Sequence, residues 1–367
     1  MSGLATPPPP GGKTQTSPPR PPVVAAFDAL PEHVRASIRA KQAAKKAKKA
    51  KKAKQPRATS PKTNADKSKD APALPPGQRR SVTAAEYMRA APHRFKDRQI
   101  PPALSSVPLL VNAALSPDSG IEKCGYFQFY GSEAELWEPA FFAFLAHSGF
   151  FVITDHKGEP LPELQPFYGV LTEATFEGSR FNRACLAKLG REGGCPYKLV
   201  DSAADADRCW RALEDYHVEK HECNWLTRKY LAAMEKASEK RGVNYRLHIV
   251  EMQDGDGKVV AAEFGFSCGS VYTSLSGWCE RTGDRLGEVQ LVLLGRWLFK
   301  SGYAFWSLGH CYVPEMQYKQ NLGQVIYERA AFLELLEKHS GKFVGGGMER
   351  KLGGEVQGRD LLAAGGR

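Results

Sequence analysis

The stretch from Tyr245 to Leu275 decides the fold, because it contains three predicted strands joined by tight turns. YRLHIVEM (245–252) alternates apolar and polar residues, as a strand with one buried face does. DGDG (254–257) is a strong hairpin turn, and KVVAAEFGF (258–266) returns as the partner strand. SVYTSL (270–275) predicts a third strand. The stretch therefore predicts an antiparallel meander.

Further helices and strands are predicted on both sides of this meander. After it come an apolar helix at 284–300 capped by Asp284, a strand at 303–308 and an amphipathic helix at 322–339. Before it, the expected elements are a short strand at 150–154 and helices at 132–146, 205–220 and 226–240. A meander followed by a strand–helix–strand crossover is the plan of the Gcn5-related N-acetyltransferase (GNAT) fold, of the α+β class. Because many functions share one fold, this order predicts architecture and not activity.

The two ends of the chain differ in charge. Residues 1–100 hold 22 Lys+Arg against 6 Asp+Glu, whereas residues 101–367 hold 29 against 34. The first hundred residues also contain 15 of the 25 prolines and no Cys or Trp. Such a segment cannot bury enough apolar surface to offset the entropy of ordering. We therefore expect residues 1–100 to be a disordered basic tail.

The densest basic stretch of this tail is KQAAKKAKKAKKAK (41–54). Lysines close to phosphates release counterions and provide salt-sensitive affinity without sequence preference. The lysines expected to contact nucleic acid are Lys45, Lys46, Lys48, Lys49, Lys51 and Lys52. A solubilising or nuclear-targeting role for the same run stays open. If it binds nucleic acid, deleting residues 1–100 is expected to weaken binding and to leave the fold intact.

The remaining residues are expected to form the folded body. We expect a smaller N-terminal α/β subdomain at 120–222, an acyltransferase-like domain at 223–345 and a flexible glycine-rich tail at 346–367. The eight Cys form no Cys-x-x-Cys pair, so no metal site is predicted. No apolar run approaches the ~18 residues of a membrane span, and no signal-peptide core is present at the start. These features predict a cytoplasmic protein without membrane contact, and we expect a monomer.

Six stretches of the body resemble, in order, the motifs of one known family. NWLTR (224–228) resembles its Trp-Ile-Thr motif, and VAAEFGFSCGSVY (260–272) aligns with its glycine-rich hairpin. The others are FAFLAHSGFFV (142–152), residues 164–181, CPYKLV (195–200) and the Leu322-Gly323 turn. The family is leucyl/phenylalanyl-tRNA–protein transferase, and the resemblance runs from about Glu138 to Lys338. Its members move an amino acid from tRNA to a protein N-terminus, which marks the protein for degradation.

Two active-site positions of that family differ in this sequence. A Gly-Glu-Ser-Met-Phe-Ser run follows the family hairpin, and its Glu lies in the active site, whereas Leu275 occupies that position here. The family strand that ends Asp-Cys-Gln corresponds to WSLGH (306–310), where the Asp and Gln are out of register. The resemblance therefore implies either substitute catalytic groups or an inactive module that binds tRNA or degrons.

Three residues are candidates for catalysis: His310, Glu263 and Ser276. A neutral His or a carboxylate can take the proton from an attacking amine. His310 follows a predicted strand, and desolvation between apolar neighbours would raise the pKa of Glu263. Ser276 can donate a hydrogen bond to the ester. Each also has a purely structural alternative, as a loop His, an outward-facing Glu or a turn Ser.

Four aromatic residues are candidates for a substrate pocket: Trp225, Tyr272, Trp278 and Trp306. With Leu275 they can enclose a Leu- or Phe-like side chain or stack on a terminal adenine. Aromatic residues at strand spacing mostly belong to the core, so we expect about two of the four to contact substrate.

The sequence predicts an aminoacyltransferase of the N-degron pathway that carries a Leu-, Phe- or Met-like amino acid. The resemblance implies aminoacyl-tRNA as co-substrate, no other cofactor, and acceptor proteins or peptides with a basic N-terminal residue. The alternative is an acetyl-CoA-dependent N-acetyltransferase, in which RTGDRLG (281–287) would hold the pyrophosphate at the start of a helix. That loop lacks the usual Gln/Arg-x-x-Gly-x-Gly/Ala spacing.

Overall fold

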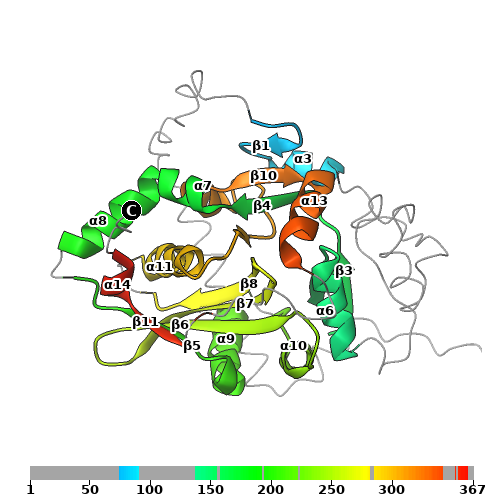
Figure 1. The fold of residues 1–367 in the computed structure, drawn as a ribbon. Coiled ribbons are helices and arrows are strands. Elements are labelled where there is room, and N and C mark those ends of the chain that lie inside the picture. Colours follow the sequence, from blue (N-terminus) through cyan, green and yellow to red (C-terminus); the bar gives the residue numbers. More distant parts are fainter. Residues whose placement is uncertain are drawn as a thin grey trace, which may run out of the picture. The chain divides into compact units, whose positions relative to one another are not determined.

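Strands from both halves of the body form one mixed sheet in the computed structural model (Figure 1). The structure describes residues 74–90, 137–154, 158–191, 194–221, 224–281, 285–341, 352 and 354–362. Within these ranges the sheet has nine strands, in the order β1-β10-β4-β9-β8-β7-β6-β5-β11. They are β1 (Gln78–Arg79), β4 (Phe167–Leu171), β5 (Lys198–Asp201), β6 (Arg246–Gln253), β7 (Val259–Cys268), β8 (Val271–Cys279), β9 (Phe305–Ser307), β10 (Val325–Glu328) and β11 (Glu355–Gln357). The strands β2 (Phe151–Thr154) and β3 (Pro160–Glu163) form a separate pair.

Helices lie on both faces of this sheet. The helices are α3 (Ala84–Ala90), α6 (Pro139–His147), α7 (Glu173–Gly178), α8 (Arg180–Arg191), α9 (Ala206–His221), α10 (Arg228–Glu239), α11 (Leu286–Lys300), α12 (Gln317–Asn321), α13 (Arg329–Ser340) and α14 (Gly358–Leu362). Around the central strands, α9 and α10 lie on one face and α11 on the other (Figure 1).

The meander β6-β7-β8 is the centre of the sheet and confirms the predicted fold class. Its strands pair antiparallel, with Ile249 opposite Phe264 and Phe264 opposite Ser276. Because successive side chains of a strand point to opposite faces, β6 contributes to two cores. Leu247 and Ile249 pack with α9 and α10, whereas Val250 packs with α11. This alternation is the pattern that the sequence shows.

Strands β8 and β9 separate after a short parallel pairing. Val271, Tyr272 and Thr273 pair with residues 305–307. Strand β8 then continues to Cys279, while β9 ends at Ser307. Open sheets bind ligands outside the carboxyl ends of parallel strands, where such a gap arises. The divergence therefore leaves one edge of β8, from Ser274 onward, available to a ligand.

The basic tail is shorter than predicted, because residues 74–90 belong to the folded body. Strand β1 pairs with β10, and the side chains of Val82 and Tyr87 are fully buried. Tyr87 packs with Phe167, Cys311 and Ile326 in a small cluster, so these few apolar residues suffice to hold the segment. A deletion of residues 1–100 would therefore remove part of the fold. The lysine run at 41–54 lies outside the described residues.

The chain end and the subdomain boundary also differ from the prediction. Within the expected tail at 346–367, β11 pairs with β5, and Leu361 is buried against the α11 side of the sheet. The predicted units at 120–222 and 223–345 do not separate, since both contribute strands to one sheet within a single unit. Both the structure of the chain end and the absence of a subdomain boundary result from strand pairing between segments far apart in the sequence. Local sequence patterns do not predict such pairing.

Three helix starts differ from the prediction. The helix expected at 322–339 begins at Arg329, because residues 325–328 pair as β10 between β1 and β4. Helix α6 begins at Pro139, whose missing N–H is tolerated at the first helical position. Helix α11 begins at Leu286 with Arg285 as N-cap in a left-handed conformation. The predicted caps Ser132 and Asp284 lie outside the described residues.

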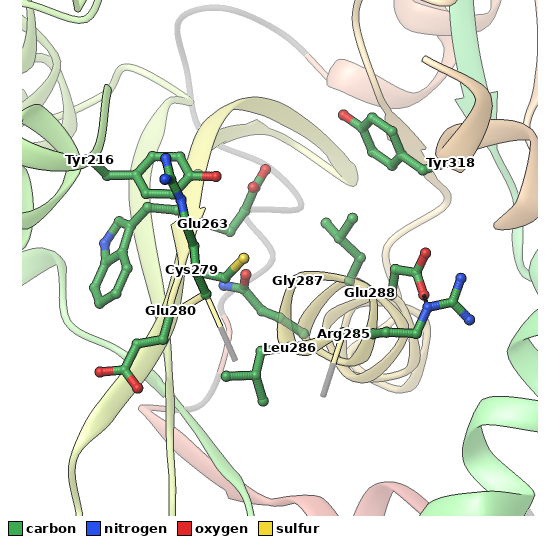
Figure 2. Close-up of a pocket in the computed structure, with 14 residues that line it drawn as sticks. Tyr216, Glu263, Cys279, Glu280, Arg285, Leu286, Gly287, Glu288 and Tyr318 are labelled. Carbon is green, nitrogen blue, oxygen red and sulfur yellow. Dashed lines mark ion pairs between the residues drawn. The ribbon is translucent and has the colours of Figure 1, made fainter. Parts of the chain in front are cut away.

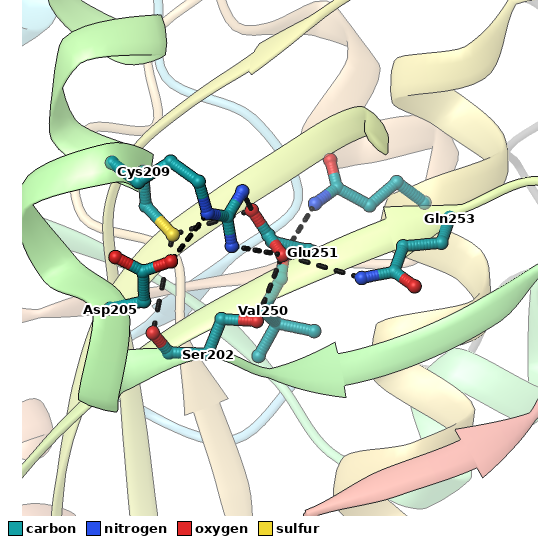
Figure 3. A network of polar contacts seen from close by, with 8 residues as sticks. Ser202, Asp205, Cys209, Val250, Glu251 and Gln253 are labelled. Carbon is teal, nitrogen blue, oxygen red and sulfur yellow. Dashed lines mark hydrogen bonds and ion pairs between the residues drawn. The ribbon is translucent and has the colours of Figure 1, made fainter. Parts of the chain in front are cut away.

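An ion pair between a buried carboxylate on β6 and a half-exposed arginine joins β6 to the start of α9 (Figure 3). The guanidinium of Arg208 donates to both carboxylate oxygens of Glu251, at 2.7 and 3.0 Å, and Ser202 Oγ donates to the same group at 2.9 Å. Burial opposes ionisation of Glu251, but the hydrogen bonds from Arg208 and Ser202 outweigh it, so its pKa is lowered. The negative charge of Glu251 is thus balanced by Arg208, and we assign this network a structural role.

Candidate functional site

Two adjoining cavities lie where β8 leaves β9. Cavity A, of about 530 Å³, is bounded by residues 277–281, at and just after the end of β8, and by the first turn of α11. Cavity B, of about 620 Å³, is bounded by residues 274–277, the loop after β9, and α9. Both are lined by Glu263, Gly277, Leu291 and Tyr318. Figure 2 shows cavity A, with Glu263 reaching it from β7 and Tyr318 at one side.

Glu263 is the buried carboxyl group shared by the two cavities. Its residue is only 6% exposed, and its Oε1 has no hydrogen-bond partner among the described residues. Burial raises the pKa of Glu263 from 4.5 to about 8, although a hydrogen bond from Ser274 and the charge of Lys319 favour the ionised form. The expectation of a raised pKa holds here, and the outward-facing alternative does not. A carboxyl group that titrates near neutrality can accept and return a proton.

Lys319 is a buried amine in the wall of cavity B, at a position where the sequence predicts no site residue. Its Nζ donates to the carbonyl oxygens of Leu308 at 2.5 Å and His310 at 2.8 Å. Burial lowers the pKa of Lys319 from 10.5 to about 8. These bonds anchor the loop that follows β9. A single lysine in the polar segment MQYKQN (316–321) carries no pattern that signals burial.

His310 lines cavity B, as its position after the strand predicts. Its Nε2 lies 3.0 Å from Oε2 of Glu163, which is buried, and its ring contacts those of Tyr87 and Phe151. Cys311 is fully buried, and burial raises the pKa of its thiol to about 12, so it is unsuited to act as a nucleophile. His310 is therefore held in place by a carboxylate from β3, a residue that the sequence did not associate with it.

Ser276 also lines cavity B and has a histidine partner from α9. Its Oγ lies 3.0 Å from Nε2 of His217. Burial and the neighbouring His221 lower the pKa of His217, which favours the neutral ring. His217 is not among the candidates predicted from the sequence, although His217 and His221 are four residues apart and therefore share one face of the predicted helix.

The predicted aromatic pocket is only partly assembled. Trp225 lines cavity B with Leu275, and Trp278 lines cavity A. Tyr272 and Trp306 are fully buried in the core on the α11 side of the sheet. The Nε1 of Trp306 donates to Ser274 Oγ at 2.7 Å. This tryptophan therefore holds a side chain of β8 in place and does not itself line a cavity. Two of the four aromatics thus face the cavities.

Local capping places Trp225 at the cavity. Thr227, in the stretch that resembles the Trp-Ile-Thr motif, is the N-cap of α10, and its side chain accepts a hydrogen bond from Tyr230 N. Thr154 Oγ1 on β2 donates to the carbonyl oxygen of Trp225 at 2.5 Å. The indole ring packs against Phe151. The motif therefore begins a helix and orients one wall of cavity B.

Asp201, His248 and Ser267 form a hydrogen-bonded chain like that of a catalytic Ser-His-Asp triad, but they lie away from both cavities. His248 Nδ1 lies 2.7 Å from Asp201 Oδ2, and His248 Nε2 lies 2.9 Å from Ser267 Oγ. His248 and Ser267 are buried within adjacent strands, and none of the three lines cavity A or B. Their geometry satisfies buried polar groups across β5, β6 and β7.

No group of three or more His, Cys, Asp or Glu in the described part of the chain is arranged to hold a metal ion. No helix within the same residues is long and apolar enough to cross a membrane.

Comparisons with known proteins agree with this architecture. Residues 180–320 match the family model described as an acetyltransferase (GNAT) domain, so this part of the chain is similar to GNAT domains. This range includes α8 to β9 and the residues of β7 and β8 that line both cavities. A search of curated proteins found no match.

Solved structures show only a distant likeness. FemX is 12% identical, with coverage of 64% of this chain and 80% of that one and a TM-score of 0.38. The L-PGS structure from Bacillus licheniformis is 12% identical (64% and 78% coverage, TM-score 0.33). The C-terminal domain of a putative lysylphosphatidylglycerol synthetase from Agrobacterium fabrum is 13% identical (58% and 73% coverage, TM-score 0.32). At these scores the likenesses do not bear on substrate.

Proposed function

We propose that this protein transfers a hydrophobic aminoacyl group from tRNA to the amine of an acceptor, and that the acceptor is the N-terminus of a protein in an N-degron pathway. The observation that carries the proposal is Glu263, a buried carboxyl with an unpartnered oxygen at the junction of two cavities. The ordered motif resemblance supports tRNA as the donor.

The cavities suit the parts of such a reaction. Apolar side chains of Ile153, Trp225 and Leu275 line cavity B and can enclose a Leu-, Phe- or Met-like side chain. Cavity A is lined by Trp278, whose Nε1 is also buried without a partner among the described residues. Unpartnered buried polar atoms are costly, so a polar ligand group at this junction would be bound favourably.

Glu263 can replace the glutamate that the resembled family carries at the position of Leu275. The two positions lie on neighbouring strands, since Glu263 pairs with Gly277 across β7 and β8. In the reaction, the amine nitrogen forms a bond to the ester carbonyl carbon, and the bond from that carbon to the ribose oxygen breaks. The Glu263 carboxylate takes one proton from the amine and returns it to the ribose oxygen. An aminoacyl ester is already activated, so positioning and this proton path suffice.

The test is transfer of labelled Leu, Phe or Met from charged tRNA to a peptide that begins with Arg or Lys. At about pH 8.5, above the pKa of about 8 for Glu263, we expect a peptide one residue longer. The same peptide with an acetylated N-terminus is the control, because it lacks the attacking amine. Absence of product from folded protein contradicts the proposal, and tRNA binding without turnover would identify an inactive binding module.

A second candidate is acetyl transfer from acetyl-coenzyme A to an amine, with coenzyme A as the leaving thiol, favoured by cavity A at the start of α11 together with the family match at 180–320. Helix N-termini bind phosphates, and Arg281 and Arg285 line this cavity. Binding of coenzyme A at a hundred times its Kd would add about 2.7 kcal/mol of stability. A thermal-shift titration that shows no rise with coenzyme A excludes this candidate.

A further inference from the structure

Two serines of β8, two residues apart, form hydrogen bonds on opposite faces of the sheet. The pairing of β7 with β8 shifts by one residue, so that Leu275 is an extra residue between Ser274 and Ser276. Such a bulge changes the direction of the side chains next to it. Ser274 Oγ accepts a hydrogen bond from Trp306, in the core on the α11 side. Ser276 Oγ instead bonds to His217 of α9, which packs on the other face. The bulge therefore directs the Ser276 hydroxyl to a helix that lines cavity B.

Ser276 and His217 form a hydrogen-bonded pair in the wall of cavity B. The hydroxyl oxygen lies 3.0 Å from Nε2 of the ring, and both residues are only partly buried, so a ligand in the cavity can reach them. Burial lowers the pKa of His217, which favours the neutral ring that can take a proton. A hydrogen bond to the backbone of Gly277 acts in the opposite direction and stabilises the ring once it is protonated. The pair therefore combines a hydroxyl group with a neutral base and a partner for the protonated base.

The other residues of cavity B indicate which ligands this pair would meet. Ile153, Trp225 and Leu275 line the cavity with apolar side chains, which can enclose an apolar acyl chain. Lys220 and Lys319 line the same cavity and provide positive charge. Positive charge stabilises the oxyanion that forms when an ester carbonyl is attacked. The cavity therefore suits a carboxylic ester with an apolar acyl group.

We propose that Ser276 and His217 are a nucleophile and its base, and that they hydrolyse carboxylic esters whose apolar acyl group binds in cavity B. Ser276 Oγ forms a bond to the ester carbonyl carbon, and His217 takes its proton and passes it to the alcohol oxygen as the bond to that oxygen breaks. Water then attacks the acyl-serine carbon. His217 takes one proton from the water and returns it to Ser276 Oγ as the acyl-serine bond breaks, which releases the carboxylic acid. This activity needs neither tRNA nor an amine, so it goes beyond the proposed transfer and does not depend on it.

Hydrolysis of p-nitrophenyl butyrate by the full chain, in a buffer free of amines, measures this activity. Ser276→Ala and His217→Gln should each lower kcat/KM by about 10²- to 10⁴-fold. Because a nucleophile and its base act as a unit, the double variant should lose little more than the weaker of the two single variants. Ser267→Ala is the matched control, since it removes a serine that is bonded to a histidine but buried away from the cavities. Its partner His248 keeps the hydroxyl of Tyr303 at 3.4 Å, so we expect this control to fold and to hydrolyse the ester like wild type.

Covalent labelling of the wild-type chain identifies the nucleophile and requires no variant to fold. A fluorophosphonate probe forms a bond from its phosphorus to an activated serine oxygen and releases fluoride, and mass spectrometry locates the labelled peptide. We expect the label on Ser276, much slower labelling in His217→Gln, and none on Ser267. The inference is overturned if wild type is labelled elsewhere or not at all, if Ser276→Ala hydrolyses the ester within about twofold of wild type, or if Ser267→Ala loses as much activity. Neither assay contains tRNA or an acceptor amine, so failure here leaves the proposed transfer standing, and failure of transfer leaves this inference standing.

Discussion

Replacing Glu263 with glutamine is expected to lower kcat/KM for aminoacyl transfer by about 10²- to 10⁴-fold, the usual contribution of general acid–base catalysis. Glutamine preserves the size of the side chain and removes only the proton transfer. The matched control is Glu315→Gln, because Glu315 lines cavity B but is exposed. We expect this control to retain activity within a few-fold. Equal loss in both variants, or none in Glu263→Gln, would remove Glu263 from the reaction.

The same Glu263→Gln substitution is expected to stabilise the protein at alkaline pH. In the unfolded chain Glu263 ionises near pH 4.5, whereas the folded state keeps its proton until about pH 8. A raised carboxyl pKa stabilises the fold below pH 4.5, and this contribution is lost as pH rises to about 8. Glutamine never ionises, so the gain in melting temperature over wild type should grow across that range and level off above it. Each pKa unit corresponds to about 1.4 kcal/mol, so the gain is a few kcal/mol at most.

Thermal unfolding of both proteins between pH 4 and 9 measures this effect. The difference between the two melting temperatures at each pH removes the contribution of groups that titrate alike in both proteins. A melting-temperature difference that is constant with pH would mean that Glu263 ionises normally. Lower activity combined with higher stability is the signature expected of a group held in an unfavourable environment for function.

Removing residues 1–90 is expected to destabilise the protein severely, whereas removing residues 1–72 is not. Residues 1–72 lie outside the compact unit of residues 73–367, whereas the segment 74–90 covers Phe167, Cys311 and Ile326 with the side chains of Val82 and Tyr87. Its loss would expose this cluster and remove the strand that pairs with β10. Circular dichroism melts of the two truncated proteins provide the comparison. A similar melting temperature for both would show that the segment contributes nothing to the fold.

Point substitutions at Tyr87 test the same contact in the full chain. Tyr87→Ala removes a fully buried ring and should cost about 3–5 kcal/mol. Tyr87→Phe keeps the ring and loses the hydroxyl that donates to Glu163 at 3.4 Å, a loss of about 1 kcal/mol. Because Glu163 in turn bonds to His310, the phenylalanine variant should alter transfer activity more than stability. If activity is unchanged in Tyr87→Phe, the link from the N-terminal segment to the cavity is structural only.

Local patterns were sufficient for much of the fold. The meander followed from alternation in 245–275 and from the DGDG turn, both of which are properties of a few neighbouring residues. The crossover through α11 and the strand β9 followed from one apolar helix between strands. Strand β10 lies within the predicted helix at 322–339, because VIYE (325–328) becomes a strand only when β1 and β4 supply its hydrogen bonds.

The sequence by itself determined the GNAT-like order of elements, the charge difference between the chain's ends, and the candidates Glu263, His310 and Ser276. Only the tertiary structure decided that these three line one cavity, that Tyr272 and Trp306 belong to the core, and that Lys319 is buried beside them. Burial and pKa depend on neighbours far along the chain, such as Glu163 beside His310, which the sequence order does not reveal. Periodicity reports which face of an element is apolar, but the chemistry of a site depends on which elements meet there.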